Sequence, residues 1–201
     1  MGRAEKRGIV HDIWEVIKIM LTAVILATII VQFIRPTRVE GLSMYPTLEN
    51  NDYLIINRIS RFTGVKRGQI VVFDSKLPVN SGNDQAKSDV QKAIDFILQD
   101  DSSTKDLVKR VIAVGGDHLV IKNEKVIVNG KELSEPYVMK GNKTYGNINM
   151  VIPKGEVFCM GDNRMRSFDS RYPEVGCIPQ NKIIGTVLVR ILPLNSIGFL
   201  K

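Results

Sequence analysis

The sequence predicts a mainly β fold, preceded by one long apolar helix and interrupted by one helical insertion. An apolar run near the start is long enough for such a helix, and most of the chain after it alternates short β-branched runs with Gly, Pro and Asn. A single later stretch changes to helical spacing. With 201 residues, of which 44% are hydrophobic, the chain can form one compact domain and an appendage, but not two full-sized domains.

The apolar run covers residues 13–34 and is interrupted only by Glu15, Lys18 and Gln32. A helix of this length spans roughly the 30 Å hydrocarbon core of a bilayer, because it rises about 1.5 Å per residue. Glu15 and Lys18 lie one turn apart near its start, where both side chains can reach the membrane surface. The run therefore predicts a transmembrane anchor helix.

A removable signal peptide is the alternative, because basic residues stand among the first 7 positions. The apolar run is long for that class, and residues 32–36 lack the small side chains of a cleavage site. We therefore expect an uncleaved single-pass anchor in the cell membrane. Residues 1–12 are expected in the cytoplasm and residues 35–201 outside it, as an extracytoplasmic domain.

Short runs rich in β-branched residues, each bounded by turn residues, predict the strands of this domain. They are Tyr53–Asn57, Gln69–Phe73, Leu107–Val114, His118–Lys122, Lys125–Asn129, Glu156–Met160 and Ile183–Ile191. Asn123-Glu124 has the length of a tight hairpin loop, and Asn129-Gly130 is a favoured turn sequence. Apart from one insertion, the domain is expected to be all β.

One stretch, residues 77–104, breaks the strand pattern. It opens with turn-forming residues, after which apolar residues recur at helical spacing: Val90, Ala93, Ile94, Ile97 and Leu98. We expect an inserted loop and a helix from Ser88 to Gln99. The first interpretation is a surface insertion that packs its apolar stripe on the β domain. The alternative is a lid, or a docking surface for a partner.

The chain is basic, with 28 Lys and Arg against 21 Asp and Glu and a pI near 9.4. Such an excess suits either nucleic acid or an anionic membrane surface. The apolar run favours the membrane, so we expect contact with membrane lipid and no nucleic acid partner. No Cys, His or carboxylate cluster has the spacing of metal ligands, and we expect neither a metal nor another cofactor.

Ser43, in the block Gly41–Leu48, comes soon after the apolar run and is a candidate nucleophile. A serine nucleophile needs a base, and the chain has 2 histidines, His11 before the apolar run and His118 in a predicted strand. Neither supports a Ser/His/Asp triad. Considered alone, Ser43 does not establish a nucleophile, because most serines are solvated or cap an element.

Lys109 is the other candidate base, because it interrupts the apolar strand 107–114. By alternation, Lys109 shares a face with Leu107, Val111 and Ala113. An ammonium on such a face loses hydration, so its pKa is expected to fall from about 10.4 toward neutrality. The free amine can then accept a serine proton. The alternative is an edge-strand lysine that discourages aggregation.

Four sequence blocks occur in a fixed order: Gly41–Leu48, Arg67–Phe73, Lys109–Asp117 and Gly161–Arg171. Together they resemble the blocks of the bacterial type I signal peptidases, membrane-anchored serine proteases that use a Ser/Lys dyad. The blocks span most of the chain after Arg35, and their joint occurrence after an apolar N-terminal run is specific. The resemblance implies a β-rich catalytic domain with a coiled β-barrel.

The resemblance implies that Ser43 is the nucleophile and that Lys109 is the general base. The positions that match supporting residues are Ser167, Asp169, Arg171 and Arg110. The serine among them is implied to orient the lysine through a hydrogen bond. The aspartate and the arginine at position 171 are implied to form a salt bridge that braces their loop.

Stabilisation of the oxyanion requires at least two hydrogen-bond donors. The resemblance supplies the Ser43 backbone N–H as the first donor. Some family members add a serine hydroxyl two residues earlier, where this chain has Gly41. The second donor must then be a backbone group or a water, and the sequence leaves its identity open.

Several apolar residues match family positions that form shallow pockets for the first and third residues before the cut: Met44, Leu48, Leu54, Val72 and Val108. Shallow pockets admit Ala, Gly or Ser, which is the A-x-A pattern of secretory leaders. Asp106, Leu107 and Val108 are implied to offer a strand edge to an extended substrate. For each apolar residue alone, a place in the core is the alternative.

The implied function is removal of N-terminal signal peptides from exported preproteins by a monomeric enzyme, with the export machinery as a further candidate partner. Two alternatives stay open. One is a non-catalytic, membrane-bound assembly factor or chaperone for surface proteins, which the presence of both Ser43 and Lys109 disfavours. The other is an intracellular self-cleaving regulator with the same dyad, which the apolar N-terminal run disfavours.

The 2 cysteines, Cys159 and Cys177, pair only if the fold brings them together, and the sequence leaves this open. Cys159 lies inside a predicted strand, which favours a buried free thiol. Neither residue has a basic partner pattern, so neither is expected to act as a nucleophile.

Overall fold

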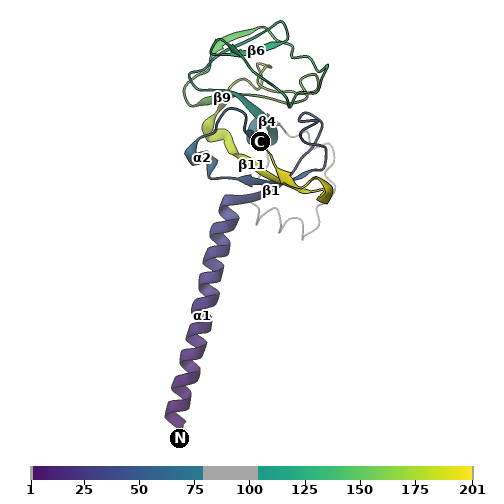
Figure 1. Ribbon diagram of the computed structural model, residues 1–201. Helices are drawn as coiled ribbons and strands as arrows, with labels where there is room; N and C mark the ends of the chain where they lie inside the picture. Colours follow the sequence, from purple (N-terminus) through teal and green to yellow (C-terminus); the bar gives the residue numbers. More distant parts are fainter. Residues whose placement is uncertain (1, 79–103, 201) are drawn as a thin grey trace.

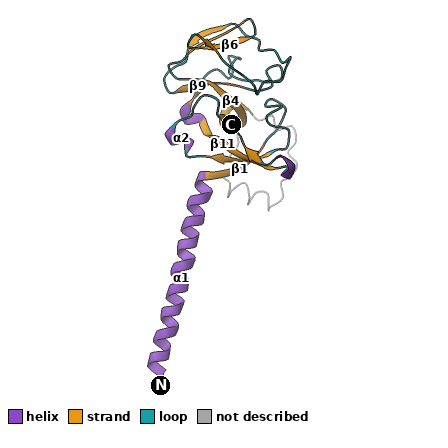
Figure 2. Cartoon of the chain, viewed as in Figure 1, coloured by secondary structure: helices purple, strands orange, loops and turns teal. Residues whose placement is uncertain are grey.

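The computed structural model describes residues 2–78 and 104–200 (Figure 1). A long helix, α1 (Gly2–Phe33), extends away from a β domain formed by the other described residues. Strands dominate this domain in Figure 2. Its helical segments are short, namely α2 (Ser60–Thr63), η1 (Gln180–Lys182) and η2 (Leu194–Ser196). The predicted mainly β class is confirmed.

The larger of two sheets has eight strands in the order β1-β2-β11-β3-β4-β9-β10, with β12 paired to β11. Their bounds are β1 (Ile34–Arg38), β2 (Tyr53–Asn57), β3 (Ile70–Pro78), β4 (Thr104–Val114), β9 (Glu156–Met160), β10 (Ile178–Pro179), β11 (Ile183–Leu192) and β12 (Gly198–Phe199). Neighbouring strands are antiparallel. Because β4 lies between β3 and β9, the middle of β4 is inside the domain.

The described strands do not form the closed barrel that the resemblance implied. At one end of the larger sheet β1 pairs with β2, at the other β10 pairs with β9, and no described pairing joins the two ends. Register shifts interrupt the pairing of β11 with β2 and β3 and of β4 with β9, and such bulges bend a sheet locally.

The smaller sheet has four strands in the order β7-β6-β5-β8. Their bounds are β5 (His118–Lys122), β6 (Lys125–Val128), β7 (Lys131–Glu132) and β8 (Ile148–Val151). Asn123 and Glu124 have φ angles of 52° and 64°, and Asn129 and Gly130 have 52° and 78°. Positive φ at both central residues is the turn geometry that suits a two-residue hairpin, so both predicted turns are confirmed.

Three buried clusters form the core. One joins the smaller sheet to β9 through Phe158 and Met160. A second packs β2 and β3 against the segment that contains Met44 and Leu48. The third connects β3, β4 and β9 around Phe73. Because burial of one large apolar side chain contributes about 1.5–3 kcal/mol, the second cluster stabilises the position of the segment around Ser43.

All predicted strands are present, with differences at their ends. β3 continues to Pro78 and β4 begins at Thr104, so both ends of the predicted insertion 77–104 are strand. The rest of that insertion, including the helix predicted at residues 88–99, lies outside the described residues. Strands β1, β7, β8, β10 and β12 were not predicted, because two to five residues carry too little periodicity.

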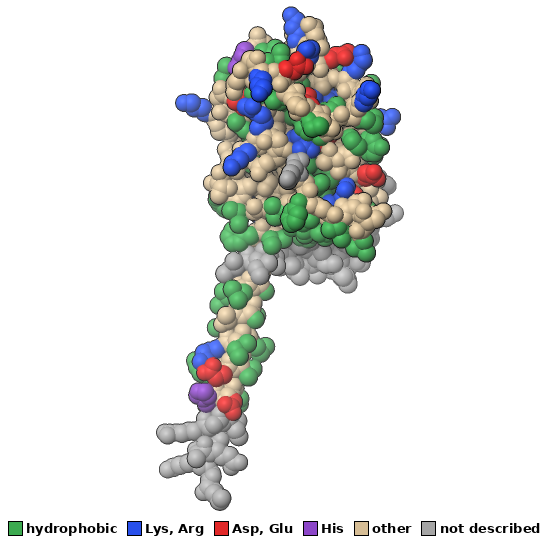
Figure 3. Space-filling model, viewed as in Figure 1, with side chains coloured by type: hydrophobic (Ala, Val, Ile, Leu, Met, Phe, Trp, Pro, Cys, Tyr) green, Lys and Arg blue, Asp and Glu red, His purple; other side chains and the backbone are tan. Residues whose placement is uncertain are grey.

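The predicted apolar helix lies within α1, although Ile34 at its predicted end belongs to β1. Figure 3 shows hydrophobic side chains along the described part of α1 and charged ones nearer its start. Lys18 pairs there with Glu15, one turn away. Within the part of the chain that the structure describes, no helix meets the combined length and apolarity of a membrane span.

Candidate active site

The Ser43 hydroxyl and the Lys109 amine meet in the structure. Nζ of Lys109 lies 2.8 Å from Oγ of Ser43 and donates a further hydrogen bond of 2.9 Å to the Val108 carbonyl. The Lys109 residue is only 2% exposed. A buried amine within hydrogen-bond distance of a hydroxyl is the arrangement that proton transfer between the two groups requires.

Lys109 is positioned by the middle of the larger sheet. On β4 it lies opposite Val71 of β3, and its alternate neighbours Leu107 and Val111 pack in the cluster around Phe73. Ala113, which alternation also predicts for this face, packs instead in the cluster of the smaller sheet. The register shift after Val111 explains this difference, because a bulge interrupts the alternation of side chains.

Ser43 lies in the irregular segment between β1 and β2 and is held there by Asn163. The Ser43 carbonyl accepts a hydrogen bond of 3.0 Å from the Asn163 backbone N–H. The Leu42 carbonyl accepts another of 3.0 Å from Asn163 Nδ2. Directly after the serine, Met44 is 1% exposed in the core. The nucleophile candidate is therefore fixed by hydrogen bonds on one side and by packing on the other.

Gly41 precedes this point with a φ of +90°, a backbone conformation that glycine adopts without strain. Its N–H donates a hydrogen bond of 2.9 Å to Oδ1 of Asn50. This N–H is therefore already engaged as the segment stands. The Gly41 N–H was one candidate for the second oxyanion donor, and it would have to leave Asn50 to take that role.

Asp169 and Arg171 form the ion pair that the resemblance implied. Nε and Nη2 of Arg171 donate to the two carboxylate oxygens of Asp169 at 2.8 and 3.0 Å. Asp169 also accepts the Gly161 N–H at 3.0 Å, and Arg171 donates to the Arg164 carbonyl at 2.7 Å. The pair thereby closes the loop 161–171 onto its own start.

Ser167 lies in this loop but does not make the hydrogen bond to Lys109 that was expected. Its Oγ is buried and has no hydrogen-bond partner among the described residues. Ser167 instead lies close to Gly161, where an added Cβ would be 2.2 Å from Ser167 Oγ and 2.4 Å from the Ser43 carbonyl oxygen. Glycine at position 161 is therefore what lets this loop approach the nucleophile segment.

Arg110 lies next to the candidate base and is bound by Asp162. Nε and Nη2 of Arg110 donate to the carboxylate at 2.9 and 2.7 Å, and the two side chains are 3% and 0% exposed. Thr47 donates to the same carboxylate, and the Arg110 guanidinium stacks on the Tyr137 ring at 4.1 Å. Cation–π stacking adds to the ion pair where water is excluded.

Sequence reasoning assigned no role to Asp162, Asn163 or Thr47. Asp162 and Asn163 lie in the block Gly161–Arg171 that matches the family, and this match is the sequence feature from which a role could have been inferred. Their partners are about 50 and 120 residues away in the chain, at separations of 52 for Arg110 and 121 for Leu42. Contacts over such distances follow from topology, which no local pattern encodes.

The apolar residues predicted to form substrate pockets lie together in one cluster of the core. Four of them are at most 1% exposed, and the fifth packs against them: Met44, Leu48, Leu54 and Val72, with Val108. Asp106 and Leu107 are half-buried on β4, opposite Asp74 and Phe73. The structure thus brings the set together beside Ser43 and Lys109, with its side chains largely covered by one another.

Cys159 and Cys177 are both free thiols. Burial raises the pKa of the Cys159 thiol far above its ordinary value, and it raises the pKa of Cys177 to about 11. Both thiols are therefore protonated at neutral pH and lack the reactivity of a thiolate. Among the residues that the structure describes, no three His, Cys, Asp or Glu side chains are placed to hold a metal ion.

Comparisons with known proteins identify the family of the chain. Residues 13–192 match the family described as signal peptidase, peptidase S26. Signal peptidase I of Bacillus amyloliquefaciens is 32% identical over 91% of this chain and 87% of its own length. Signal peptidase I of Bacillus licheniformis is 33% identical over 93% and 92%, and signal peptidase I T of Bacillus subtilis is 32% identical over 89% and 85%.

A crystal structure of a signal peptidase I from Enterococcus faecalis V583 is similar to 61% of this chain, over 95% of its own length, with 23% identity and a TM-score of 0.42. The family match covers nearly the whole sequence, and relatives above 30% identity extend over most of it. The chain therefore belongs to the signal peptidase family, peptidase S26, and is a peptidase.

Proposed function

We propose that this peptidase removes N-terminal signal peptides from exported preproteins, with Ser43 as the nucleophile and Lys109 as the general base. The observation that carries the proposal is the 2.8 Å contact between Lys109 Nζ and Ser43 Oγ, made by an amine that is 2% exposed. The relatives named signal peptidase I supply the substrate class.

In the first step, neutral Lys109 takes the hydroxyl proton while Ser43 Oγ attacks the scissile carbonyl carbon. Lys109 then gives that proton to the leaving amine, which leaves the signal peptide as an ester on Ser43. A water, deprotonated by the same amine, attacks the ester carbonyl, and Lys109 returns this proton to Ser43 Oγ as the signal peptide leaves with a free carboxyl end. Burial supports this role because an ammonium removed from water is disfavoured relative to the free amine.

The oxyanion that forms in both steps needs donors aimed at one point. We assign the Ser43 backbone N–H as the first donor. Gly41 has no side-chain hydroxyl, and its N–H is engaged by Asn50. A water, or another backbone group made available when substrate binds, is therefore the second donor in this mechanism.

Specificity for small residues before the cut follows from the cluster beside the dyad. Met44, Leu48 and Val72 are at most 1% exposed, so they leave no deep pocket among themselves, and the partly buried Val108 is the residue of this set that a substrate side chain can meet. Filled apolar surface accepts Ala, Gly or Ser and excludes larger side chains by overlap. We therefore expect cleavage after an A-x-A pattern.

We further propose that residues 13–34 anchor the enzyme in the cell membrane as a single pass. Residues 1–12 are then cytoplasmic, and the β domain of residues 35–201 faces outward. The apolar, exposed side chains along α1, such as Ile19, Leu21 and Val24, support this location because water does not favour a helix so covered. Exported preproteins reach the outer face of the cell membrane, and the proposed orientation of the anchor puts Ser43 on that face.

The test is cleavage of a precursor with an A-x-A leader by the purified full-length protein in detergent, with mass spectrometry to locate the cut. Wild type is compared with Ser43→Ala and with Val151→Ala, a matched control on the 60% exposed valine of β8. Cleavage after the second Ala by wild type and control, but not by Ser43→Ala, is expected. Equal cleavage by Ser43→Ala would overturn the assignment of the nucleophile.

Two outcomes separate the parts of the proposal. Cleavage of the precursor at a site outside the A-x-A pattern would leave the nucleophile in place and reject the specificity. A folded wild-type protein that binds the precursor without cutting it, with lipid supplied, would favour the assembly-factor alternative over the enzyme.

A further inference from the structure

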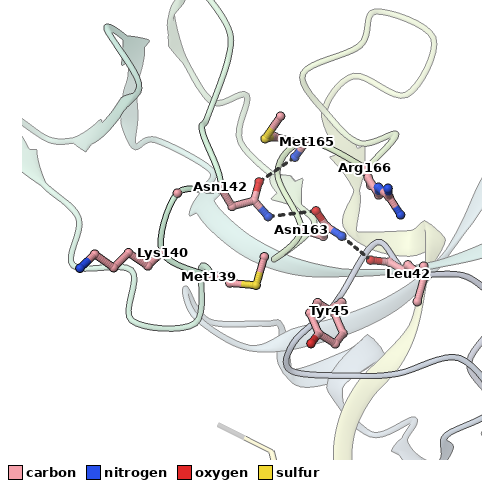
Figure 4. Close-up of a pocket in the computed structure, with 9 residues that line it drawn as sticks. Leu42, Tyr45, Met139, Lys140, Asn142, Asn163, Met165 and Arg166 are labelled. Atoms are coloured by element: carbon pink, nitrogen blue, oxygen red, sulfur yellow. Dashed lines mark hydrogen bonds between the residues drawn. The ribbon is translucent and has the colours of Figure 1, made fainter.

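A pocket beside Ser43 takes no part in the mechanism above. Figure 4 shows this side pocket, a cavity of about 450 Å³. It is lined by Leu42, Tyr45, Met139, Lys140, Gly141, Asn142, Asn163, Met165 and Arg166. Leu42 directly precedes Ser43 and Tyr45 lies two residues after it, so one wall of the side pocket is the nucleophile segment itself. Its volume falls in the ~300–1,000 Å³ range of binding sites.

Four apolar side chains of the side pocket are partly exposed. Leu42, Tyr45, Met139 and Met165 are 44%, 37%, 46% and 58% exposed, and all four line the same cavity. Apolar side chains gathered in one hollow gain free energy when another apolar group covers them. Two of the four are methionines, whose flexible thioethers adapt to side chains of different shape.

The polar groups of the side pocket are already bound to one another. Asn142 Nδ2 donates to Asn163 Oδ1 at 2.9 Å, and Asn142 Oδ1 accepts the Met165 N–H at 3.0 Å. Asn163 Nδ2 donates in turn to the Leu42 carbonyl (Figure 4). These bonds fix the loops 139–142 and 161–171 against the nucleophile segment. The side pocket is thereby a built site whose remaining binding capacity is mainly apolar.

The charges around the side pocket have one sign. Among the residues that the structure describes, its lining contains two cations, Lys140 and Arg166, and no carboxylate. In Figure 4 the Lys140 side chain extends away from the other labelled residues, so its charge lies outside the apolar part. A Lys or Arg side chain that entered this site would lose hydration without gaining an opposite charge, which disfavours basic occupants.

The side pocket is lined by other residues than the groups assigned to the acyl half of the substrate. Lys109 contacts the serine from β4, and its amine also donates to the Val108 carbonyl. The side pocket includes no residue of β3 or β4 and none of the apolar cluster around Leu48. It is built from the loops 139–142 and 163–166 and from the nucleophile segment, so it is separate from the strand to which the proposed mechanism assigns the residues before the cut.

We propose that the side pocket binds an apolar side chain in the segment that follows the scissile bond. The start of the mature protein would then be a second determinant of cleavage, independent of the A-x-A pattern before the cut. This inference rests on the proposed function, because it assumes that Ser43 attacks a peptide bond in an extended chain. An apolar residue in the first three positions after the cut favours cleavage, and a basic one disfavours it.

A kinetic test uses precursors with one A-x-A leader and with Leu, Phe, Ala or Lys placed in turn at the first, second and third positions after the cut. At one of these positions, wild type is expected to cleave the Leu or Phe precursor with a kcat/KM about tenfold above that of the Ala precursor, the size of effect that an apolar pocket gives. The Lys precursor is expected to fall below the Ala precursor.

The variants then connect this preference to the side pocket. The double variant Met139→Ala/Met165→Ala is expected to remove most of the advantage of the Leu and Phe precursors over the Ala precursor. Met165→Glu is expected to raise the rate for the Lys precursor. The control Val151→Ala should keep the wild-type preference. Equal rates for all precursors with wild type would overturn the inference, whereas no cleavage of any precursor would instead contradict the proposed function.

Photo-crosslinking locates the contact without depending on turnover. A precursor with benzoylphenylalanine at the preferred position after the cut is irradiated with Ser43→Ala protein, and the crosslinked residue is identified by mass spectrometry. Crosslinks to Met139 or Met165 are expected. Crosslinks to these methionines from a probe placed three residues before the cut, and none from the probe after it, would assign the side pocket to the leader and reject the proposal.

Discussion

A buried ion pair between Arg110 and Asp162 joins the two halves of the site. Arg110 directly follows Lys109, the proposed base. Asp162 directly precedes Asn163, whose backbone N–H donates to the Ser43 carbonyl. Arg110 belongs to β4, whereas Asp162 belongs to the loop 161–171. Asp162 also accepts a hydrogen bond from Thr47, four residues after the nucleophile. One carboxylate therefore connects the base, the loop and the nucleophile segment.

Removal of one member of this pair is expected to cost more than removal of both. Asp162→Leu leaves the Arg110 guanidinium buried without its carboxylate and should lower the free energy of unfolding by about 3–5 kcal/mol. Arg110→Met should have a similar effect. Urea unfolding of both single variants and of the double variant measures the coupling. A double variant as unstable as the sum of the single ones would contradict a coupled pair.

Lys109, the proposed base, provides a second prediction. Lys109→Arg keeps a cation of similar length, but a guanidinium with a pKa above about 12 cannot accept a proton from serine at working pH. We expect kcat to fall to the level of Ser43→Ala while circular dichroism and the unfolding midpoint show a folded protein. Turnover near the wild-type rate would show that another group takes the proton.

Gly161 provides a third prediction, because the space for its side chain is already occupied. A Cβ there would lie 2.2 Å from Ser167 Oγ and 2.4 Å from the Ser43 carbonyl oxygen, so Gly161→Ala must displace the nucleophile segment. We expect a large loss of kcat and a lower unfolding midpoint. Gly198→Ala is the matched control, since an added Cβ there meets nothing within 4 Å. Similar behaviour of the two variants would show that the loop adapts.

Ser167 gives a fourth prediction, in which stability and activity separate. Its buried hydroxyl has no partner among the described residues, so Ser167→Ala removes an unsatisfied polar group and should raise the stability by about 1 kcal/mol. If this hydroxyl binds the Lys109 amine once substrate is present, kcat falls in the same variant. A variant with unchanged kcat would limit Ser167 to packing beside Gly161.

Much of this structure was accessible from sequence, and the parts that were not have physical causes. The long strands were predicted because each carries enough β-branched residues between turn formers, and the turn at Asn123-Glu124 because its length fits a hairpin. Ser43 and Lys109 were found through their blocks, and their contact across 66 residues then follows from the fold. Ala113 was misplaced because a bulge interrupts alternation without a local signal.

The side pocket could not have been predicted in the same way. Its walls come from the nucleophile segment and from two loops that are remote in sequence, and it depends on hydrogen bonds of Asn142 and Asn163 over separations of 21 and 121 residues. The open ends of the larger sheet likewise depend on pairing between strands that are distant in sequence. The residue pattern of a single strand does not indicate its partners. Topology, rather than propensity, decides both features.

Asp117 provides a prediction for the dependence of stability on pH. It ends the turn after β4, where its carboxylate accepts hydrogen bonds of 2.8 Å from the Val114 N–H, from Arg67 and from Asn129. Val114 ends a strand of the larger sheet, and Asn129 follows β6 of the smaller one. This carboxylate therefore holds the two sheets together at their junction.

Burial by itself raises the pKa of Asp117, but the hydrogen bonds from Val114, Arg67 and Asn129 outweigh it and hold this pKa below its ordinary value of 3.8. A carboxyl whose pKa is lower in the folded than in the unfolded state stabilises the fold above its unfolded pKa, and loses that contribution as pH falls through the folded pKa. Asp117→Asn should therefore lower the free energy of unfolding at pH 7 by about 1–3 kcal/mol, the cost of losing charged hydrogen bonds.

The difference between wild type and Asp117→Asn should then shrink as the pH is lowered below 3.8, because the wild-type carboxyl is protonated there and loses the same charge. Urea unfolding of both proteins between pH 7 and pH 3 measures this difference, in which the titration of all other groups cancels. Glu132→Gln is the control, since its exposed pair with Lys125 contributes little to stability. A difference that stays constant across the range would mean that Asp117 acts through packing rather than through its charge.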